Sequence, residues 1–163
     1  MTVIPDVSLA ELEREELELQ LDGFTNEDAL ALGLRLVEVA RAERLAVTVN
    51  ICRGEQRLFH HALEGTSADN DVWIERKNRV VRRFGHSSLL MGRRAAQSGR
   101  SFGEQALVDE REFAAHGGAF PLNVRGVGLV GTVTVSGLPQ LEDHRLVVRV
   151  LREFAARGGT TPG

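Results

Sequence analysis

Two spacings of apolar residues alternate along this chain. Apolar side chains every three or four positions are typical of a helix with one buried face, and apolar side chains at every second position are typical of a strand. Together with capping residues, the first spacing predicts helices from Ser8, from Thr25 to about Arg44, from Asp71 to Phe84, from Ser87 or Ser88 to about Gly99, and from Pro139. Asp69 or Asn70 is the expected cap of the third helix, and a further short helix is expected over Asp109–Ala115.

The strand spacing occurs in two pairs of neighbouring segments. The first pair is Ala46–Cys52 and Gln56–Leu63, and the second is Ala119–Val124 and Val127–Ser136. Segments joined by such short turns form hairpins, in which neighbouring strands run antiparallel. The chain is therefore predicted to be an α+β protein, with an antiparallel sheet covered by helices.

The last of these segments begins with GVGLVG, from Gly126 to Gly131, which matches the glycine spacing of a dinucleotide-binding loop. Such a loop works only between a strand and a helix whose N-terminus holds the pyrophosphate. Here the β-branched residues of Thr132–Ser136 follow, and they favour a strand. The glycines are therefore expected to enter a strand, and no dinucleotide-binding fold is predicted.

Composition restricts the class of protein. The 163 residues are enough for one domain with its own core. A net charge of −3 argues against broad nucleic-acid binding. No apolar run approaches the roughly 20 residues of a membrane-spanning helix, and the first residues lack the basic and apolar regions of a signal peptide. Because the single cysteine, Cys52, suits a reducing compartment, we expect a cytoplasmic protein without membrane contact.

Charge is distributed unevenly along the chain. Residues 6–28 contain nine carboxylates and one arginine, whereas residues 76–100 contain eight cations and no carboxylate. One interpretation is that the two segments face each other, within a subunit or between subunits. The other is that the basic segment meets an anionic ligand or nucleic acid. The slightly acidic net charge favours the first interpretation and makes nucleic acid the weaker one.

Lysine occurs once in the sequence, at Lys77, and the other 19 of the 20 basic residues are arginine. Lys77 falls on the same face of the third helix as Trp73, Ile74, Val81 and Phe84. A lysine, unlike an arginine, loses its proton when it is desolvated. Lys77 is therefore either a functional amine or a lysine that extends past Trp73 to water.

His116 is the leading candidate for an axial ligand or an acid–base group, because Gly117 and Gly118 follow it and allow backbone to approach a ligand closely. His144 lies at the start of the apolar stripe of the last helix, which is typical of a partly buried, hydrogen-bonded histidine, and it is kept as a further binding candidate. The spacings between the histidines match no zinc motif.

Ser136 and Gly137 lead into the last helix. The free N–H groups and the dipole of a helix start favour an anion such as a carboxylate. An ordinary strand-to-helix turn would give the same residues.

Four segments carry a resemblance to a known family: FTNEDALALGLRLVEVA, NDVWIERKNRVVRRFGHSS, HGGAFPLNVRG and GTVTVSGLPQLEDH. Through them the chain resembles the GlcG/HbpS-like family, also called the haem-degrading domain, and within it a branch of uncharacterised bacterial and fungal proteins. The resemblance implies a profilin-like fold, an antiparallel sheet flanked by helices, and a homo-oligomer. It covers residues 23–157, which leaves residues 1–22 as an N-terminal helical extension and residues 158–163 as an expected disordered tail.

The resemblance also implies which positions form a site. The matching positions are Lys77, Gly117, Gly118, Ser136, Gly137 and Asp143. Some members bind haem or related tetrapyrroles, so haem is the implied cofactor. Trp73 and Phe84 would then line an apolar slot, His116 would be the axial ligand of the iron, and arginines would bind the propionates.

Three functions remain open on these residues. The first is binding of haem, another tetrapyrrole or a small ligand, with or without haem degradation. The second is a non-catalytic accessory role of an oligomer. The third is an enzyme that acts on a small carboxylate, with Lys77 and the helix start near Ser136 as its anion site.

Overall fold

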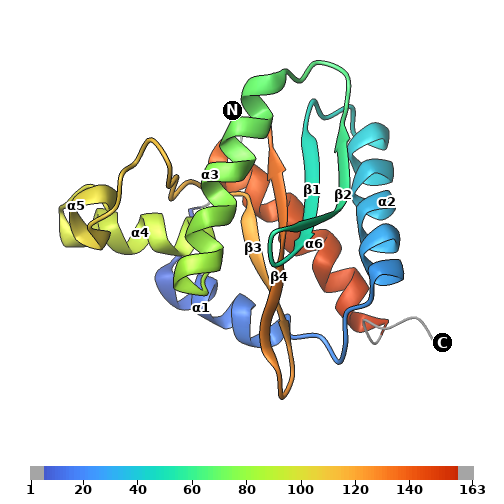
Figure 1. Cartoon of the computed structure of the whole chain (residues 1–163), viewed down its shortest axis with the longest axis horizontal. Helices are drawn as coiled ribbons and strands as arrows, with labels where there is room; N and C mark the ends of the chain where they lie inside the picture. The colour runs from blue at the N-terminus through green and yellow to red at the C-terminus, as the bar shows by residue number, and fades with distance from the viewer. Residues whose placement is uncertain (1–5, 158–163) are drawn as a thin grey trace.

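A four-stranded antiparallel sheet covered by helices on both faces forms the protein (Figure 1). The computed structural model describes residues 6–157, so the tail expected at residues 158–163 lies outside the described residues. The strands are β1 (Thr48–Arg53), β2 (Gln56–Ala62), β3 (Ala119–Val124) and β4 (Gly128–Ser136), in the sheet order β2-β1-β4-β3. The helices are α1 (Leu9–Glu18), α2 (Asn26–Ala42), α3 (Ala68–Phe84), α4 (Ser88–Ser98), α5 (Phe102–Ala106) and α6 (Gln140–Ala156). Both predicted hairpins and the predicted α+β class are confirmed.

Reciprocal hydrogen bonds fix the starts of the first two helices. The Glu11 N–H donates to Ser8 Oγ at 3.1 Å, and the Ser8 N–H donates to Glu11 Oε2 at 3.2 Å. Thr25 and Asp28 repeat this arrangement at the start of α2. Such capping boxes satisfy N–H groups that have no partner inside the helix, which is why both predicted starts are confirmed.

The third helix begins three residues earlier than predicted. Ser67 precedes its first residue, Ala68, and the Ser67 N–H donates to the side-chain oxygen of Asn70 at 2.9 Å. Asn70 and Asp69 therefore lie in the first turn of α3 and are not its caps.

The short helix expected over Asp109–Ala115 is also misplaced. The structure has α5 before it, because Ser101 Oγ accepts the Glu104 N–H at 3.2 Å and starts the helix there. Asp109 instead accepts the Arg111 N–H at 2.9 Å and forms a turn. A carboxylate that bonds the backbone two residues later favours a turn over a helix.

The helices form two layers around the sheet. α2 and α6 cover one face, α3 crosses the other, and α4 and α5 project to one side (Figure 1). α1 packs on α4 through a small apolar cluster that contains Leu12, Leu89 and Leu90. The sheet therefore separates the helix that carries Lys77 from most of the helix that carries Asp143.

The two faces of the sheet differ in chemistry. Val49, Ile51, Val133 and Val135 point toward α2 and α6 and belong to the main apolar core. The alternate residues on the same strands are also buried but are mostly polar: Thr48, Asn50, Cys52, Thr132, Thr134 and Ser136. We call these six residues the polar layer. Because successive strand residues point to opposite faces, this layer lies on the α3 side.

Hydrogen bonds join α3 to the polar layer. The Asn78 side-chain amide donates to Asn50 Oδ1 at 3.0 Å, and the Thr134 hydroxyl donates to Asn78 Oδ1. Two buried hydroxyls of the layer, those of Thr48 and Thr132, have no hydrogen-bond partner among the described residues. α3 is therefore held on the sheet partly by polar contacts, beside buried apolar residues such as Ile74 and Val81.

Within the subunit, the acidic and basic segments meet where α1 lies beside α4. Arg93 pairs with Asp6 at 2.6 Å, and Arg94 pairs with Glu13 at 3.2 Å. Both pairs are between side chains of one chain, so the interpretation that the two segments face each other is confirmed for these residues.

Candidate functional site

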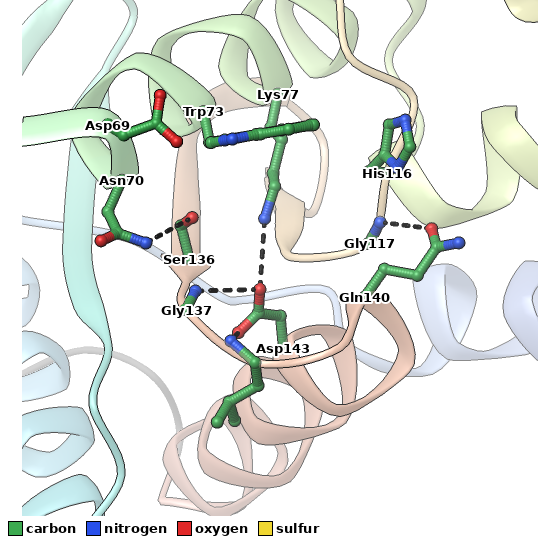
Figure 2. A pocket seen from close by; sticks show the side chains of 11 residues that line it. Asp69, Asn70, Trp73, Lys77, His116, Gly117, Ser136, Gly137, Gln140 and Asp143 are labelled. Atoms are coloured by element: carbon green, nitrogen blue, oxygen red, sulfur yellow. Dashed lines mark hydrogen bonds and ion pairs between the residues drawn. The ribbon is translucent and has the colours of Figure 1, made fainter. Parts of the chain in front are cut away.

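A cavity of about 270 Å³ opens between the start of α3, the loop before β3 and the β4–α6 connection. Of the nine residues predicted as site residues, all but Gly118 and His144 line it. Figure 2 shows the lining side chains arriving from these three separate segments. The sequence therefore identified residues that the fold brings together, although they are far apart along the chain.

An ion pair lies at the base of the cavity. Lys77 Nζ is 3.3 Å from Asp143 Oδ2 and donates to the Val135 carbonyl oxygen at 3.1 Å (Figure 2). Lys77 is 3% exposed and Asp143 is 2% exposed. The interpretation in which Lys77 extends past Trp73 to water is therefore wrong, because the amine turns inward to a carboxylate.

Asp143 also occupies the free amides at the β4–α6 connection. Its Oδ2 accepts the Gly137 N–H at 3.3 Å, and its Oδ1 accepts the Leu138 N–H at 2.9 Å. Ser136 and Gly137 were expected to attract an anion to the start of the last helix. The Gly137 and Leu138 amides instead bind a carboxylate of the chain itself, that of Asp143.

Burial shifts both members of the pair toward their neutral forms. Desolvation lowers the pKa of Lys77, and the Asp143 charge opposes this shift. Desolvation raises the pKa of Asp143 to about 6, although the Lys77 charge and the two backbone hydrogen bonds lower it. The two shifts bring the pKa values of the amine and the carboxylate closer together, which suits acid–base chemistry.

His116 stands at the mouth of the cavity, against Trp73. The two rings meet edge to face, with centroids 5.2 Å apart, and the guanidinium of Arg76 lies 4.5 Å from the Trp73 ring centroid. The His116 side chain is exposed. Partial desolvation, with the charges of Lys77 and Arg76, lowers the pKa of His116 below its ordinary 6.5. Its imidazole is therefore neutral at pH 7.

Two glycines let the backbone pass close to these groups. The Gly117 N–H donates to Gln140 Oε1 at 3.0 Å. Gly118 has φ +136°, and a Cβ there would lie 2.3 Å from the Val135 carbonyl oxygen and 2.7 Å from Lys77 Nζ. Gly118 does not line the cavity, but it leaves the space that the Lys77 amine occupies.

Ser136 and His144 have different surroundings. Ser136 Oγ lines the cavity and accepts a hydrogen bond from the Asn70 side-chain amide at 3.4 Å. His144 is buried in α6 with Nε2 2.8 Å from Glu15 Oε1, so its ring binds α1 and is not part of the cavity wall. Phe84 packs edge to face on Phe102 and lines neither this cavity nor the next one.

Three polar lining residues were missed by sequence reasoning: Asp69, Asn70 and Gln140. Asp69 and Asn70 were considered only as helix caps. The signal that would have found them is helical spacing, because both lie one turn before Trp73 and Gln140 lies three residues before Asp143.

A second cavity, of about 290 Å³, lies on the other side of His116. It shares His116 and Gln140 with the first cavity. Its walls include three arginines and two phenylalanines: Arg76, Arg93, Arg100, Phe102 and Phe113. One carboxylate, Glu110, also lines it. His116 is thus exposed between a polar cavity with a buried ion pair and a cavity in which arginines outnumber carboxylates.

Within residues 6–157, no three His, Cys, Asp or Glu side chains come together in a way that would hold a metal ion. None of the helices in the same range combines the length and the apolar character needed to span a bilayer.

Similar proteins cover almost the whole chain. A UPF0303 protein of Streptomyces coelicolor is 54% identical over 147 residues, which is 90% of this chain and 93% of the relative. The crystal structure of the Ybr137w protein matches with a TM-score of 0.87 at 35% identity, covering 94% of this chain and 90% of that one. The crystal structure of a PduOC:heme complex matches with a TM-score of 0.66 at 16% identity, over 79% and 93% of the two chains, and shows the shared fold.

The family comparison covers the same elements that build the site. A model described as haem degrading protein HbpS-like matches residues 24–152, from the start of α2 into α6. This span contains the whole sheet, Lys77, His116 and Asp143. The chain that brings these residues together therefore belongs to the HbpS-like family.

Proposed function

We propose that this protein binds haem or a similar anionic tetrapyrrole, with His116 as the axial ligand. The observation that carries the proposal is the position of His116, exposed on the rim that two cavities share. Membership of the HbpS-like family supports it, as does the likeness to a protein solved as a heme complex. Haem would supply redox chemistry at its iron, and the chain's own residues would bind and orient it.

The donor set fits this group. An axial imidazole must be neutral to offer its nitrogen lone pair, and the lowered pKa of His116 keeps it neutral at pH 7. No hydrogen bond to the His116 ring is found among the described residues, so either ring nitrogen is free for a metal. Trp73 supports one edge of the imidazole and limits its rotation.

The second cavity fits the periphery of a tetrapyrrole. Phe102 and Phe113 offer apolar surface, and arginines on the same walls suit propionate carboxylates, which guanidinium groups bind bidentately. Arg93 is already paired with Asp6, and Arg76 is stacked on Trp73. Arg100 has no ion-pair partner among the described residues, so it is the arginine best placed to take a propionate.

A haemin titration followed by visible absorption tests the proposal. We expect a shifted Soret band with wild-type protein, loss of that band in His116→Ala, and an unchanged band in the matched control His61→Ala, which removes an exposed histidine from β2. Arg100→Ala should keep the band position and weaken binding about tenfold, the equivalent of ~1.4 kcal/mol for one charge-assisted contact. An unshifted band with wild-type protein would end the proposal, and an unchanged band in His116→Ala would remove His116 as ligand.

We also propose that the protein is a homo-oligomer. Leu30 and Leu34 lie one turn apart on the outer face of α2 and are 45% and 55% exposed. Because Asp6 and Glu13 already pair with arginines of the same chain, we expect an apolar interface whose stability changes little with salt. Light scattering should give a multiple of 17.9 kDa that persists in high salt and decreases in Leu30→Ser/Leu34→Ser. A 17.9 kDa particle at micromolar concentration would contradict this.

A further inference from the structure

The buried Lys77–Asp143 pair lies outside the haem site proposed above. Burying two ionisable groups is costly, and apolar residues of similar size would hold α3 on the sheet at least as well. Lys77 Nζ nevertheless lines a cavity, with Trp73 on one side and Asp143 on the other (Figure 2). Two of its hydrogens are donated to Val135 and Asp143. In the neutral amine, one tetrahedral position then remains for the lone pair.

The charges of the cavity select against an anionic ligand. Two carboxylates, Asp69 and Asp143, line it, but Lys77 is its only cationic side chain. Because Asp143 already pairs with Lys77, no positive charge is left to receive a carboxylate. A small carboxylate, which the helix start near Ser136 suggested from sequence, is therefore the poorer match.

The remaining groups suit a neutral, hydroxylated molecule. The Ser136 hydroxyl and the Asn70 amide lie together on one wall and can both donate and accept hydrogen bonds. The Trp73 ring gives an apolar wall above the amine (Figure 2). A cavity of about 270 Å³ holds a molecule of a few carbon atoms.

From this arrangement we propose that Lys77 captures a small neutral hydroxy-aldehyde or hydroxy-ketone as an imine. The Nζ lone pair attacks the carbonyl carbon and forms the C–N bond. Both amine hydrogens leave with the carbonyl oxygen as one water molecule, so the atoms balance without an oxidant or reductant. Asp143, 3.3 Å from Nζ, carries protons from the nitrogen toward the departing oxygen.

The composition of the chain makes this capture easy to test. Lys77 is the only lysine, so its amine and the N-terminal amine are the only primary amines of the protein. We would incubate the wild-type protein with glycolaldehyde, a neutral probe, or with glyoxylate, an anionic probe with two carbons. Borohydride reduction then fixes any imine, and peptide mass mapping locates it.

The matched control is Arg57→Lys, which places a second lysine on the exposed surface of β2. In this variant, the rate at which each probe reacts with Lys77 is divided by its rate with the introduced lysine. The ratio removes the difference in intrinsic reactivity between the probes. With glycolaldehyde, Lys77 should react faster than the introduced lysine, because burial lowers the pKa of Lys77 and so raises the fraction of neutral amine. With glyoxylate, this advantage should disappear.

Two further variants separate capture from folding. Asp143→Asn keeps one oxygen, for the Leu138 amide. It removes the proton carrier and also the charge that holds the pKa of Lys77 up, so Lys77 should form the imine more slowly than in the parent although more of its amine is neutral. Lys77→Met should leave only N-terminal adduct. In the folded Arg57→Lys variant, an equal glycolaldehyde rate at Lys77 and at the introduced lysine would overturn the proposal. A preference of Lys77 for glyoxylate would overturn the neutral ligand class.

Discussion

Replacing Lys77 by methionine should destabilise the protein by an amount that grows with pH. The substitution keeps the length of the side chain and removes the amine that faces Asp143. The folded-state pKa of Asp143 is about 6, above its ordinary 3.8, so between these values the folded state binds more protons than the unfolded state and stability falls as pH rises. Without the Lys77 charge, the pKa of Asp143 rises further and the loss extends above pH 6.

The titration of Lys77 acts in the same direction. Its folded-state pKa lies below 10.5, so from that lowered value up to 10.5 the unfolded state binds more protons and wild-type stability rises with pH. Lys77→Met lacks this gain. Both shifts therefore increase the stability difference between wild type and variant as pH rises.

The size of the effect follows from the pKa of Asp143. At pH 5 this carboxyl is mostly protonated, so the variant loses little more than the hydrogen bond to Val135, about 1 kcal/mol. Each pH unit above the pKa adds up to ~1.4 kcal/mol. By pH 8 we expect a total of about 3–4 kcal/mol, within the range of about 3–5 kcal/mol for removing one partner of a buried pair.

Urea unfolding at pH 5, 6, 7 and 8 measures this difference, and the fluorescence of the single tryptophan, Trp73, reports on the site itself. The control is the double variant Lys77→Met/Asp143→Asn, which lacks both titrating groups, so the fall of stability that Lys77→Met shows between pH 6 and pH 8 should disappear. A destabilisation by Lys77→Met that is the same at pH 5 and pH 8 would refute the coupling between the two side chains.

Two comparisons of single substitutions test the packing around the site, both by urea unfolding. Gly118→Ala should cost about 2–4 kcal/mol and Gly126→Ala about 1 kcal/mol, because both have positive φ but only Gly118 would place a Cβ against the Val135 carbonyl. Equal costs would contradict this close approach. Thr132→Val should be neutral or stabilising by up to ~1 kcal/mol, whereas Thr134→Val should cost about 1–3 kcal/mol, since it leaves an oxygen of Asn78 without its donor. The reverse order would show that Thr132 has a partner in solution.

Features set by residues close in sequence could be predicted. Thr25 and Asp28 cap a helix three residues apart, and the β3–β4 hairpin closes through a short turn, so their signals are local. Lys77 stood out for a similar reason, because it shares a helix face with Trp73. The identity of its partner depends on tertiary structure, since Asp143 is 66 residues away. The family resemblance, and not spacing, singled out Asp143.

The polar layer could not be predicted, because alternation along a strand distinguishes two faces without telling whether the polar face meets water or a helix. Asn50 and Thr134 look like surface residues in the sequence and are buried under α3. The third helix was placed too late for a related reason. Ser67, Asp69 and Asn70 are all good capping residues, so the sequence alone does not tell which one precedes the helix. In the structure it is Ser67.

Docking of α3 on polar groups has a thermodynamic consequence. Among the described residues, the main apolar core contains no residue of α3, and exposing polar surface lowers the heat capacity whereas exposing apolar surface raises it. Detaching α3 would expose the polar layer together with apolar side chains such as Ile74 and Val81. Their contributions to the heat capacity have opposite signs, so the docking of α3 should vary less with temperature than the core does. Amides of α3 should exchange with solvent through a local opening that leaves α6 protected. The helix that carries Trp73 and Lys77 is thus the part of the fold best suited to admit a molecule without unfolding the rest.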